Sequence, residues 1–150
     1  MTDPRVLDDE AVLAGVRGAS ASLWTELWAA VDQLLQERPW VDWVPATEGA
    51  DGVVTVGYPI YSEPLRVVER SLYEVGAIVP FDWPSWPGQE LYPDGVGLER
   101  APAADAVRML TSVIRAERFG DGTIDACMRN GLLPRALLRL RRWYDEEHRP

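Results

Sequence analysis

Residues 105–144 read DAVRMLTSVIRAERFGDGTIDACMRNGLLPRALLRLRRWY and predict three helices separated by glycine-containing turns. Apolar side chains recur in this stretch at intervals of three and four residues, which places them along one face of each helix. The first helix is expected over about 102–119, a short one over about 121–130, and the last over about 134–147. Asp121 is the expected cap of the short helix, because its carboxylate can accept the first free backbone amides.

Both long helices of this stretch carry arginines on the side opposite their apolar stripe. These two arginine ridges are Arg108, Arg115 and Arg118 on the first helix and Arg135, Arg139 and Arg142 on the last. Arginine is a frequent contact residue in protein interfaces, so the ridges are candidate partner-binding surfaces. Pairing within the chain is the simpler alternative. For Arg115 and Arg118 we favour structural pairing with Asp82 or Asp121.

The first half of the chain predicts three more helices and one segment in which the helical spacing of apolar residues gives way to a strand-like pattern. Capped helices are expected from Asp8 to before Gly18, from about Ser20 to Arg38, and from Ser62 to Gly76. Between the last two, the segment VPATEGADGVVTVGYP (44–59) has β-branched residues around a glycine-rich turn, which predicts a small β-hairpin. Two strands alone are marginally stable, so this hairpin is expected to lie on the helices.

The predicted fold is therefore mainly α: a single compact helical domain of about six helices with a small β-hairpin. A chain of 150 residues with 47% hydrophobic content is long enough for one core and too short to suggest two domains. The domain is expected to span residues 1–150, with frayed ends at 1–6 and 145–150.

Charge and residue usage exclude several classes of function. The net charge is −9, but residues 1–99 hold 5 arginines against 17 acids, whereas residues 100–150 hold 10 arginines against 7 acids. The acidic balance argues against non-specific binding to DNA or to anionic membranes. The chain has no lysine, which excludes Schiff-base chemistry, a pyridoxal phosphate anchor and a lysine-containing phosphate-binding loop.

The sequence holds one cysteine and one histidine, Cys127 and His148. One of each cannot form a usual zinc site, and a histidine this close to the C-terminus is a poor base for a nucleophilic triad. We therefore expect neither a metal nor a cofactor. Cys127 lies between apolar neighbours and is expected to be a buried thiol, which fits a reducing compartment. Without a signal peptide or a long apolar segment, the protein is expected to be soluble, cytoplasmic and not bound to a membrane.

A proline-rich loop over residues 77–102 contains the aromatic segment PFDWPSW (80–86). Trp83 and Trp86 are expected to fold back onto the core, with at least one of them sharing it with Trp24 and Trp28. The alternative is that the loop is an exposed binding platform. Asp82 lies between two of these aromatic residues, and if buried it requires a cationic partner such as the first arginine ridge.

The order of several motifs resembles a family of small bacterial proteins of unknown function. GYPIYS, LYEVG, PFDWPSW and the stretch from Leu110 onward follow one another over about residues 55–144. The most specific features are F-D-W-x-x-W at 81–86 and R-x-x-R-F-x-D-G at 115–122. The resemblance implies one compact domain and indicates no particular chemistry.

Three classes of function follow from these observations. The favoured hypothesis is a non-enzymatic helical interaction module that binds a protein through the arginine ridges or the Trp-rich loop. The second is recognition of a phosphate ligand or nucleic acid by the same arginines. The third is an enzyme with an acid/base pair, Asp82 and Asp121, near the PFDWPSW loop. The oligomeric state stays open.

Overall fold

The computed structural model describes residues 7–36 and 38–150, and over this part of the chain it is mainly α-helical. Its α-helices are α1 (Asp9–Arg17), α2 (Ala21–Gln36), α3 (Glu63–Glu74), α4 (Gly88–Leu91), α5 (Ala103–Ala116), α6 (Thr123–Arg129) and α7 (Leu132–Glu147). The short 3-10 helices η1 (Trp83–Ser85), η2 (Pro93–Gly95) and η3 (Leu98–Arg100) lie between α3 and α5. The six expected helices are all present, and the single turn α4 is added to them.

Frayed ends were expected at residues 1–6 and 145–150, and the structure describes only the second of these segments. Residues 1–6 lie outside the described residues. Helix α7 continues through residues 145–147, which were expected to belong to a frayed tail. None of the helices that the structure describes is both long and apolar enough to cross a membrane.

Two side chains cap helices as expected. The Asp8 carboxylate accepts a hydrogen bond from the Ala11 amide at 2.9 Å, and the Ser62 hydroxyl accepts one from the Leu65 amide at 3.4 Å. Each satisfies an amide that has no acceptor within its own helix. These polar residues fix where α1 and α3 begin.

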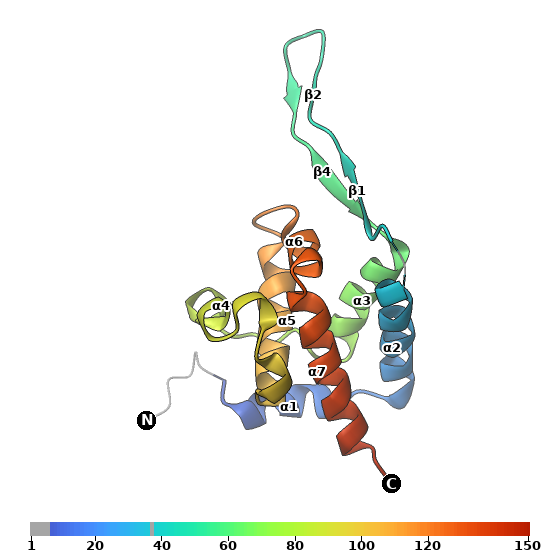
Figure 1. The fold of residues 1–150 in the computed structure, drawn as a ribbon, viewed down its shortest axis with the longest axis vertical. Coiled ribbons are helices and arrows are strands. Elements are labelled where there is room, and N and C mark those ends of the chain that lie inside the picture. Colours follow the sequence, from blue (N-terminus) through green and yellow to red (C-terminus); the bar gives the residue numbers. More distant parts are fainter. Residues whose placement is uncertain (1–6, 37) are drawn as a thin grey trace.

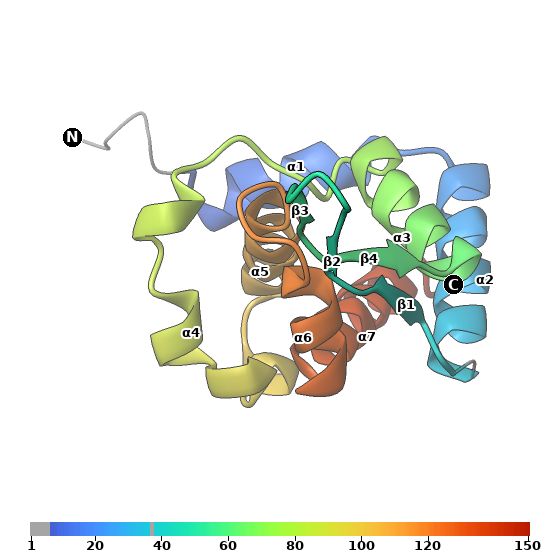
Figure 2. The ribbon, with the colours of Figure 1, turned by 90° about the horizontal axis from the view of Figure 1, so that it is seen from above.

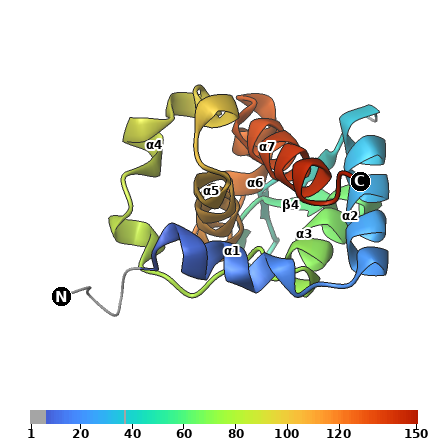
Figure 3. The ribbon, with the colours of Figure 1, turned by 90° about the horizontal axis from the view of Figure 1, so that it is seen from below.

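The helices enclose one hydrophobic core. Helices α2 and α3 lie side by side on one flank, α5 and α7 cross the middle, and α4 lies on the opposite flank (Figure 2, Figure 3). The buried Thr111 hydroxyl on α5 accepts from the Val79 amide and donates to the Ala77 carbonyl, both at 3.0 Å. These bonds hold the segment after α3 against α5 and direct the Trp-rich loop along it.

Four aromatic residues form one cluster between α2 and α7. Trp24 stacks on Trp28 with ring centroids 5.5 Å apart, and it lies 5.9 Å from Trp143 and 4.9 Å from Tyr144. Trp86 is half-buried and packs against the same core, so the prediction that one loop tryptophan shares the core with Trp24 and Trp28 is confirmed. The other loop tryptophan, Trp83, is also half-buried and is described below.

The hairpin is present, but it does not lie on the helices. Its strands are β1 (Val41–Val44), β2 (Thr47–Glu48), β3 (Val54–Thr55) and β4 (Tyr58–Tyr61), with β1 antiparallel to β4 and β2 antiparallel to β3. Residues 41–61 form a long ribbon, here called the arm, which projects away from the helical body (Figure 1). The C-terminus lies at the other end of the molecule. The predicted packing of the hairpin on the helices was wrong, because only the base of the arm is fastened to them.

Candidate protein-interaction surface

The base of the arm is fastened to α6 by one buried carboxylate. Asp125 is 1% exposed and accepts hydrogen bonds at 2.9 Å from the indole N–H groups of both Trp40 and Trp43. It also pairs with Arg129, one turn further along α6. The hydrogen bond from Arg129, helped by those from the two indoles, lowers the Asp125 pKa to about 2 although burial opposes this. A charged carboxylate thus holds the first strand of the arm.

A second carboxylate, on the turn between α5 and α6, holds the last strand. Glu117 accepts a hydrogen bond from the Tyr61 hydroxyl and also accepts from the backbone amides of Gly122 and Ile124 at 2.7 and 3.0 Å. Burial, and then this hydrogen bond, raise the pKa of Tyr61, which therefore stays a neutral donor. Glu117 occupies the capping role at the start of α6 that was predicted for Asp121. The Glu117 carboxylate thus accepts hydrogen bonds both from the arm and from the start of α6.

Gly122 lies where the arm meets the α5–α6 turn. Its φ is +96°, and a Cβ at this position would lie 2.8 Å from the Trp43 ring. We expect Gly122→Ala to lower the melting temperature and to displace Trp43, since both the backbone conformation and the contact disfavour a side chain. Thermal melting and limited proteolysis within residues 41–61 test this expectation. Gly52, which also has a positive φ but has open space around it, is the control, and equal effects of alanine at both sites would contradict the role of the Trp43 contact.

The lowered pKa of Asp125 predicts how the anchor responds to acid. Because the folded-state value of about 2 lies below the unfolded value of about 3.9, ionised Asp125 stabilises the fold above about pH 4, and this contribution is lost as the pH falls toward 2. Asp125→Asn should show a smaller loss of melting temperature between pH 5 and pH 2 than the parent protein. Parallel curves for the two proteins would show that Asp125 does not titrate in this way.

Beyond its base, the arm exposes apolar side chains to solvent. Val54 is 64% exposed, Val56 77%, Tyr58 44% and Ile60 48%. Large apolar side chains that gather on one projecting element, rather than being scattered over a surface, mark an interaction site. The arm therefore presents an unburied apolar surface on a base that is held in place.

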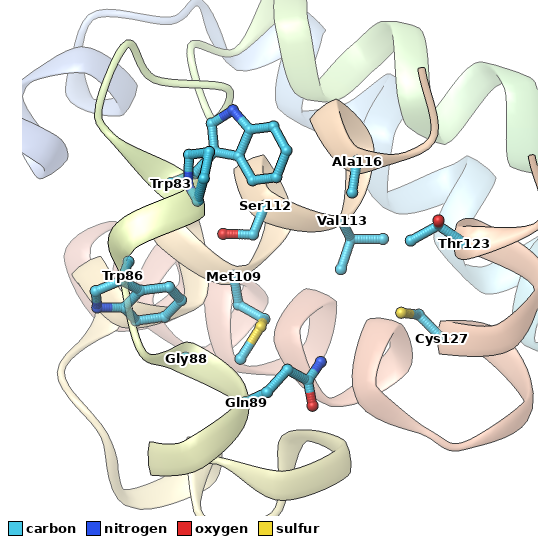
Figure 4. Close-up of a pocket in the computed structure, with 11 residues that line it drawn as sticks. Trp83, Trp86, Gly88, Gln89, Met109, Ser112, Val113, Ala116, Thr123 and Cys127 are labelled. Carbon is cyan, nitrogen blue, oxygen red and sulfur yellow. The ribbon is translucent and has the colours of Figure 1, made fainter. Parts of the chain in front are cut away.

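The Trp-rich loop forms a pocket against α5 and α6, here called the Trp83 pocket. Figure 4 shows its lining residues, which include Trp83, Trp86, Met109, Val113 and Cys127. Its volume is about 220 Å³. Small-molecule sites are usually larger, about 300–1,000 Å³, so this pocket is suited to one apolar side chain of a partner. Burial raises the Cys127 pKa to about 11, so its thiol is protonated at neutral pH and is a weak nucleophile.

An exposed aromatic ring lies beside Trp83 of this pocket, and two exposed arginines are near it in the chain. Phe119 is 83% exposed and its ring centroid is 6.1 Å from that of Trp83. Arg115 and Arg118 precede Phe119 in the chain and are exposed, as are the carboxylates of Asp82, next to Trp83, and Asp121, two residues after Phe119. These four residues, Trp83, Arg115, Arg118 and Phe119, are called the basic aromatic surface below.

The favoured pairing of Arg115 and Arg118 with Asp82 or Asp121 was wrong. All four side chains are exposed, and neither carboxylate lies within ion-pair distance of either guanidinium. Arg118 is close enough to Glu69 on α3 to favour that carboxylate's charged form, although burial, the larger influence, raises the Glu69 pKa. The loops that carry Asp82 and Asp121 flank α5 in sequence but turn these carboxylates to solvent.

The third arginine of the first ridge is structural. Arg108 is only 11% exposed; its Nη1 lies 2.7 Å from carboxylate oxygens of Asp9 and Asp105, and its Nη2 donates to the Leu7 carbonyl at 2.9 Å. These contacts connect α1 to α5. Arg108 therefore uses its donors inside the chain.

The second arginine ridge binds backbone carbonyls of the loop before α5. Arg135 donates to the Asp94 carbonyl at 2.9 Å, Arg139 to the Ala101 carbonyl at 3.0 Å, and Arg142 to the Glu99 carbonyl at 2.5 Å. Arg142 also lies 3.8 Å from Glu146, four residues further along α7, a spacing that brings two side chains together on a helix. The ridge thus fastens η2 and η3 to α7, which leaves fewer of its donors for a phosphate or a partner.

The acid/base alternative receives no geometric support. Asp82 and Asp121 are both exposed, and neither lines the Trp83 pocket. An acid/base pair requires two carboxylates positioned around one reacting group, usually in a site that shifts at least one pKa. Both acids lie at the surface, outside this pocket.

Comparison with known protein families identifies one family that the chain matches. Residues 19–146 match a family of unknown function, DUF6508. The chain belongs to this family. The match includes the arm, its anchor and the Trp83 pocket, and it confirms the resemblance noted over residues 55–144 and extends it toward the N-terminus. No curated protein and no solved structure matches the chain.

The residues that organise the site were only partly visible in the sequence. Trp83 and Phe119 belong to the two motifs noted at 81–86 and 115–122, but Trp40, Trp43 and Asp125 were not identified as a set. Asp125 is 85 residues from Trp40, so no local spacing connects them. The available signal was an acidic residue at an apolar position of a short helix, since such a carboxylate needs donors when it is buried.

Proposed function

We propose that the protein is a non-enzymatic interaction module that binds another protein through its arm. The observation that carries this proposal is the exposure of Val54, Val56, Tyr58 and Ile60 on a ribbon whose base is fixed by Asp125 and Glu117. The fixed base holds the ribbon in one orientation, which lowers the entropic cost of binding.

The low stability expected of an isolated two-stranded ribbon supports the proposal that a partner binds the arm. Two strands alone are marginal in water, and each strand of the arm has one edge on which backbone groups are not paired within the ribbon. A partner can bury the apolar side chains and pair with such an edge, as in β-strand addition. The Trp83 pocket and the basic aromatic surface extend the proposed contact area onto the body.

The proposal favours a protein partner over nucleic acid or a phosphate ligand. Four of the six ridge arginines donate to acceptors within the chain, which weakens the case for nucleic acid or phosphate. We further propose a cytoplasmic location, which the free buried thiol of Cys127 supports because reduced cysteine is typical of that compartment.

A matched pair of variants tests the proposal. Val56→Asp places a charge on the arm, and Leu138→Asp places the same charge at an exposed apolar position of α7, 48% exposed. Both should fold and melt within a few degrees of the parent, since surface substitutions usually change stability by less than about 0.5 kcal/mol. Proteins that co-purify with the parent from its own cells should be lost with Val56→Asp and retained with Leu138→Asp. Identical recovery with both variants would refute binding through the arm.

A further inference from the structure

We propose that the arm binds an extended, basic segment of a partner protein, which adds as a third strand along the outer edge of β1. This inference rests on the proposed function, because it names the chemistry and the conformation of the partner that the arm binds. Three features of the arm support it: the free backbone edge of β1, a small hollow at the base of the ribbon, and the charges along its length.

The hydrogen bonding of the ribbon leaves backbone groups of β1 free on its outer side. At the base, the Ser62 amide donates to the Trp40 carbonyl at 2.8 Å. Bonded and non-bonded pairs alternate along an antiparallel ladder, so from this pair onward the even-numbered residues of β1 and β4 bond across the ribbon and the odd-numbered ones point their backbone groups outward. Val41 and Trp43 thus present N–H and C=O groups at the outer edge of β1, and no backbone bond from another described segment reaches them.

The outer edge of β4 is less suited to a third strand. Its outward-pointing residues are Pro59 and Tyr61. Proline has no N–H to donate, and proteins use it to block pairing at the edge of a sheet. The arm projects beyond the helices (Figure 1), so the other edge, that of β1, is the one open to pairing. A third strand there would bring the ribbon to the size at which a sheet can be stable on its own.

A small hollow at the base of the arm is suited to a long cationic side chain. Its volume is about 190 Å³, and its walls include Trp40, Asp42 and Ile60. Asp42 and Ile60 are directly opposite in the ladder and therefore lie on one face of the ribbon. A lysine or arginine can lay its carbon stem on the apolar walls while its charged head reaches the Asp42 carboxylate. Because Asp42 belongs to β1, a strand added to the outer edge of β1 places side chains beside this carboxylate.

The charges along the arm favour a basic partner. Residues 41–61 contain no cationic residue and three exposed acids, Asp42, Glu48 and Asp51. None of these acids forms an ion pair with another of the described residues. Two arginines at the base have other neighbours, since Arg129 pairs with Asp125 and Arg38 lies 5.2 Å from the centre of the Trp40 ring. A segment that alternates cationic and apolar residues therefore matches the arm, whereas an acidic segment or a nucleic acid is repelled by it.

Binding of synthetic peptides to the full-length protein, measured by fluorescence anisotropy, tests the chemistry of the partner. The probe is a peptide of about eight residues that alternates arginine and valine, long enough to pair along β1. One control alternates glutamate and valine. The other is the arginine–valine peptide with N-methyl groups on alternate amides, which keeps the charge and removes the donors for strand pairing. At physiological salt, the probe should bind at least about tenfold more tightly than either control.

Substitutions on the arm test the role of Asp42. Asp42→Arg should weaken binding of the probe at least about tenfold, because it brings like charges together in the hollow. Glu90→Arg, at an exposed carboxylate on α4, changes the net charge equally and should leave the affinity within about twofold, because charges so far from the arm are screened. Asp42→Arg combined with Glu48→Arg should reverse the preference, so that the glutamate–valine peptide binds more tightly than the probe.

Hydrogen exchange locates the added strand. The amides of Val41 and Trp43 should exchange more slowly when the probe is bound, because each gains an acceptor. Slower exchange of the Tyr61 amide in their place would put the added strand on β4 and reject the assigned edge.

Other results would overturn the inference as a whole. Absence of saturable binding of the arginine–valine peptide would do so, as would equal binding of this peptide and its N-methylated copy. Equal weakening by Asp42→Arg and Glu90→Arg would reduce the effect to net charge and exclude a site at Asp42. If any of these results is found while co-purifying proteins are still lost with Val56→Asp, the arm remains a binding element and only the basic strand is rejected as its partner.

Discussion

Replacing Trp24 by alanine is expected to lower the free energy of unfolding by about 3–5 kcal/mol. Trp24 is 1% exposed and contacts Trp28, Trp143 and Tyr144, so its removal leaves a cavity between α2 and α7 that neighbouring rings cannot fill without losing their own contacts. This loss is a large share of the stability of an ordinary domain. Chemical denaturation with urea, followed by circular dichroism, measures it.

Trp83 provides the matched control for this prediction. It is only half-buried, it lies on the rim of the Trp83 pocket, and its main aromatic neighbour is the exposed Phe119. Trp83→Ala should therefore cost much less stability than Trp24→Ala, while partner binding falls if the pocket is used. A Trp24→Ala protein that unfolds at the same urea concentration as the parent would mean that the aromatic cluster does not hold α2 to α7.

Replacing Asp125 by alanine is expected to release the arm and to cost about 2–4 kcal/mol of stability. The estimate follows from the loss of several hydrogen bonds to one charged group, each of which contributes roughly 1.5–3 kcal/mol before the released indoles and guanidinium regain water. Trp40, Trp43 and Arg129 all lose their acceptor together. Thermal melting gives the stability, and limited proteolysis within residues 41–61 reports release of the arm.

Two further substitutions make the result specific to the anchor. Asp125→Asn keeps one acceptor oxygen without the charge, so its effect should lie between those of the parent and the alanine variant. Asp121→Ala removes an exposed carboxylate from the preceding turn and should change stability by less than about 0.5 kcal/mol. If proteolysis of the arm is equally slow in all of these proteins, Asp125 does not hold it.

The helical part of the fold could be read from the sequence because its signals are local. Caps such as Asp8 and Ser62, breakers such as Pro39, and apolar spacing within one helix depend on neighbours a few residues away. The same holds for the turn of the hairpin. These signals place each element along the chain and say little about what it packs against.

The arm shows what local signals leave out. Strand-like residues between 44 and 59 predicted a hairpin, and the need to bury it predicted contact with the helices. The structure instead fastens the base through Asp125 and Glu117, which lie more than 50 residues further along the chain. A carboxylate that accepts from distant indole and phenol groups has no spacing pattern, so the position of the arm could not be derived.

The arginine ridges show a related limit. An exposed-looking arginine with an acid nearby in sequence suggests an ion pair, and this holds for Arg142 with Glu146. For Arg135 and Arg139 the acceptors are main-chain carbonyls about 40 residues away. Every residue carries such a carbonyl, so nothing in the sequence distinguishes the positions that serve as acceptors.

The same carbonyl contacts determine which positions in this part of the protein can change between relatives. An acceptor on the backbone does not depend on the side chain at its own position, so the exposed residue 99 is free to change without loss of its bond from α7, whereas Ala101 is held by its burial and Asp94 by its φ of +52°. The donating side chains are more constrained. Arginine has a planar guanidinium with several N–H groups in fixed directions, and lysine has only a single ammonium, so lysine is a poor replacement at these positions. Relatives should therefore keep arginine at 135, 139 and 142 while the exposed position 99 varies, and an alignment of the family would show this difference.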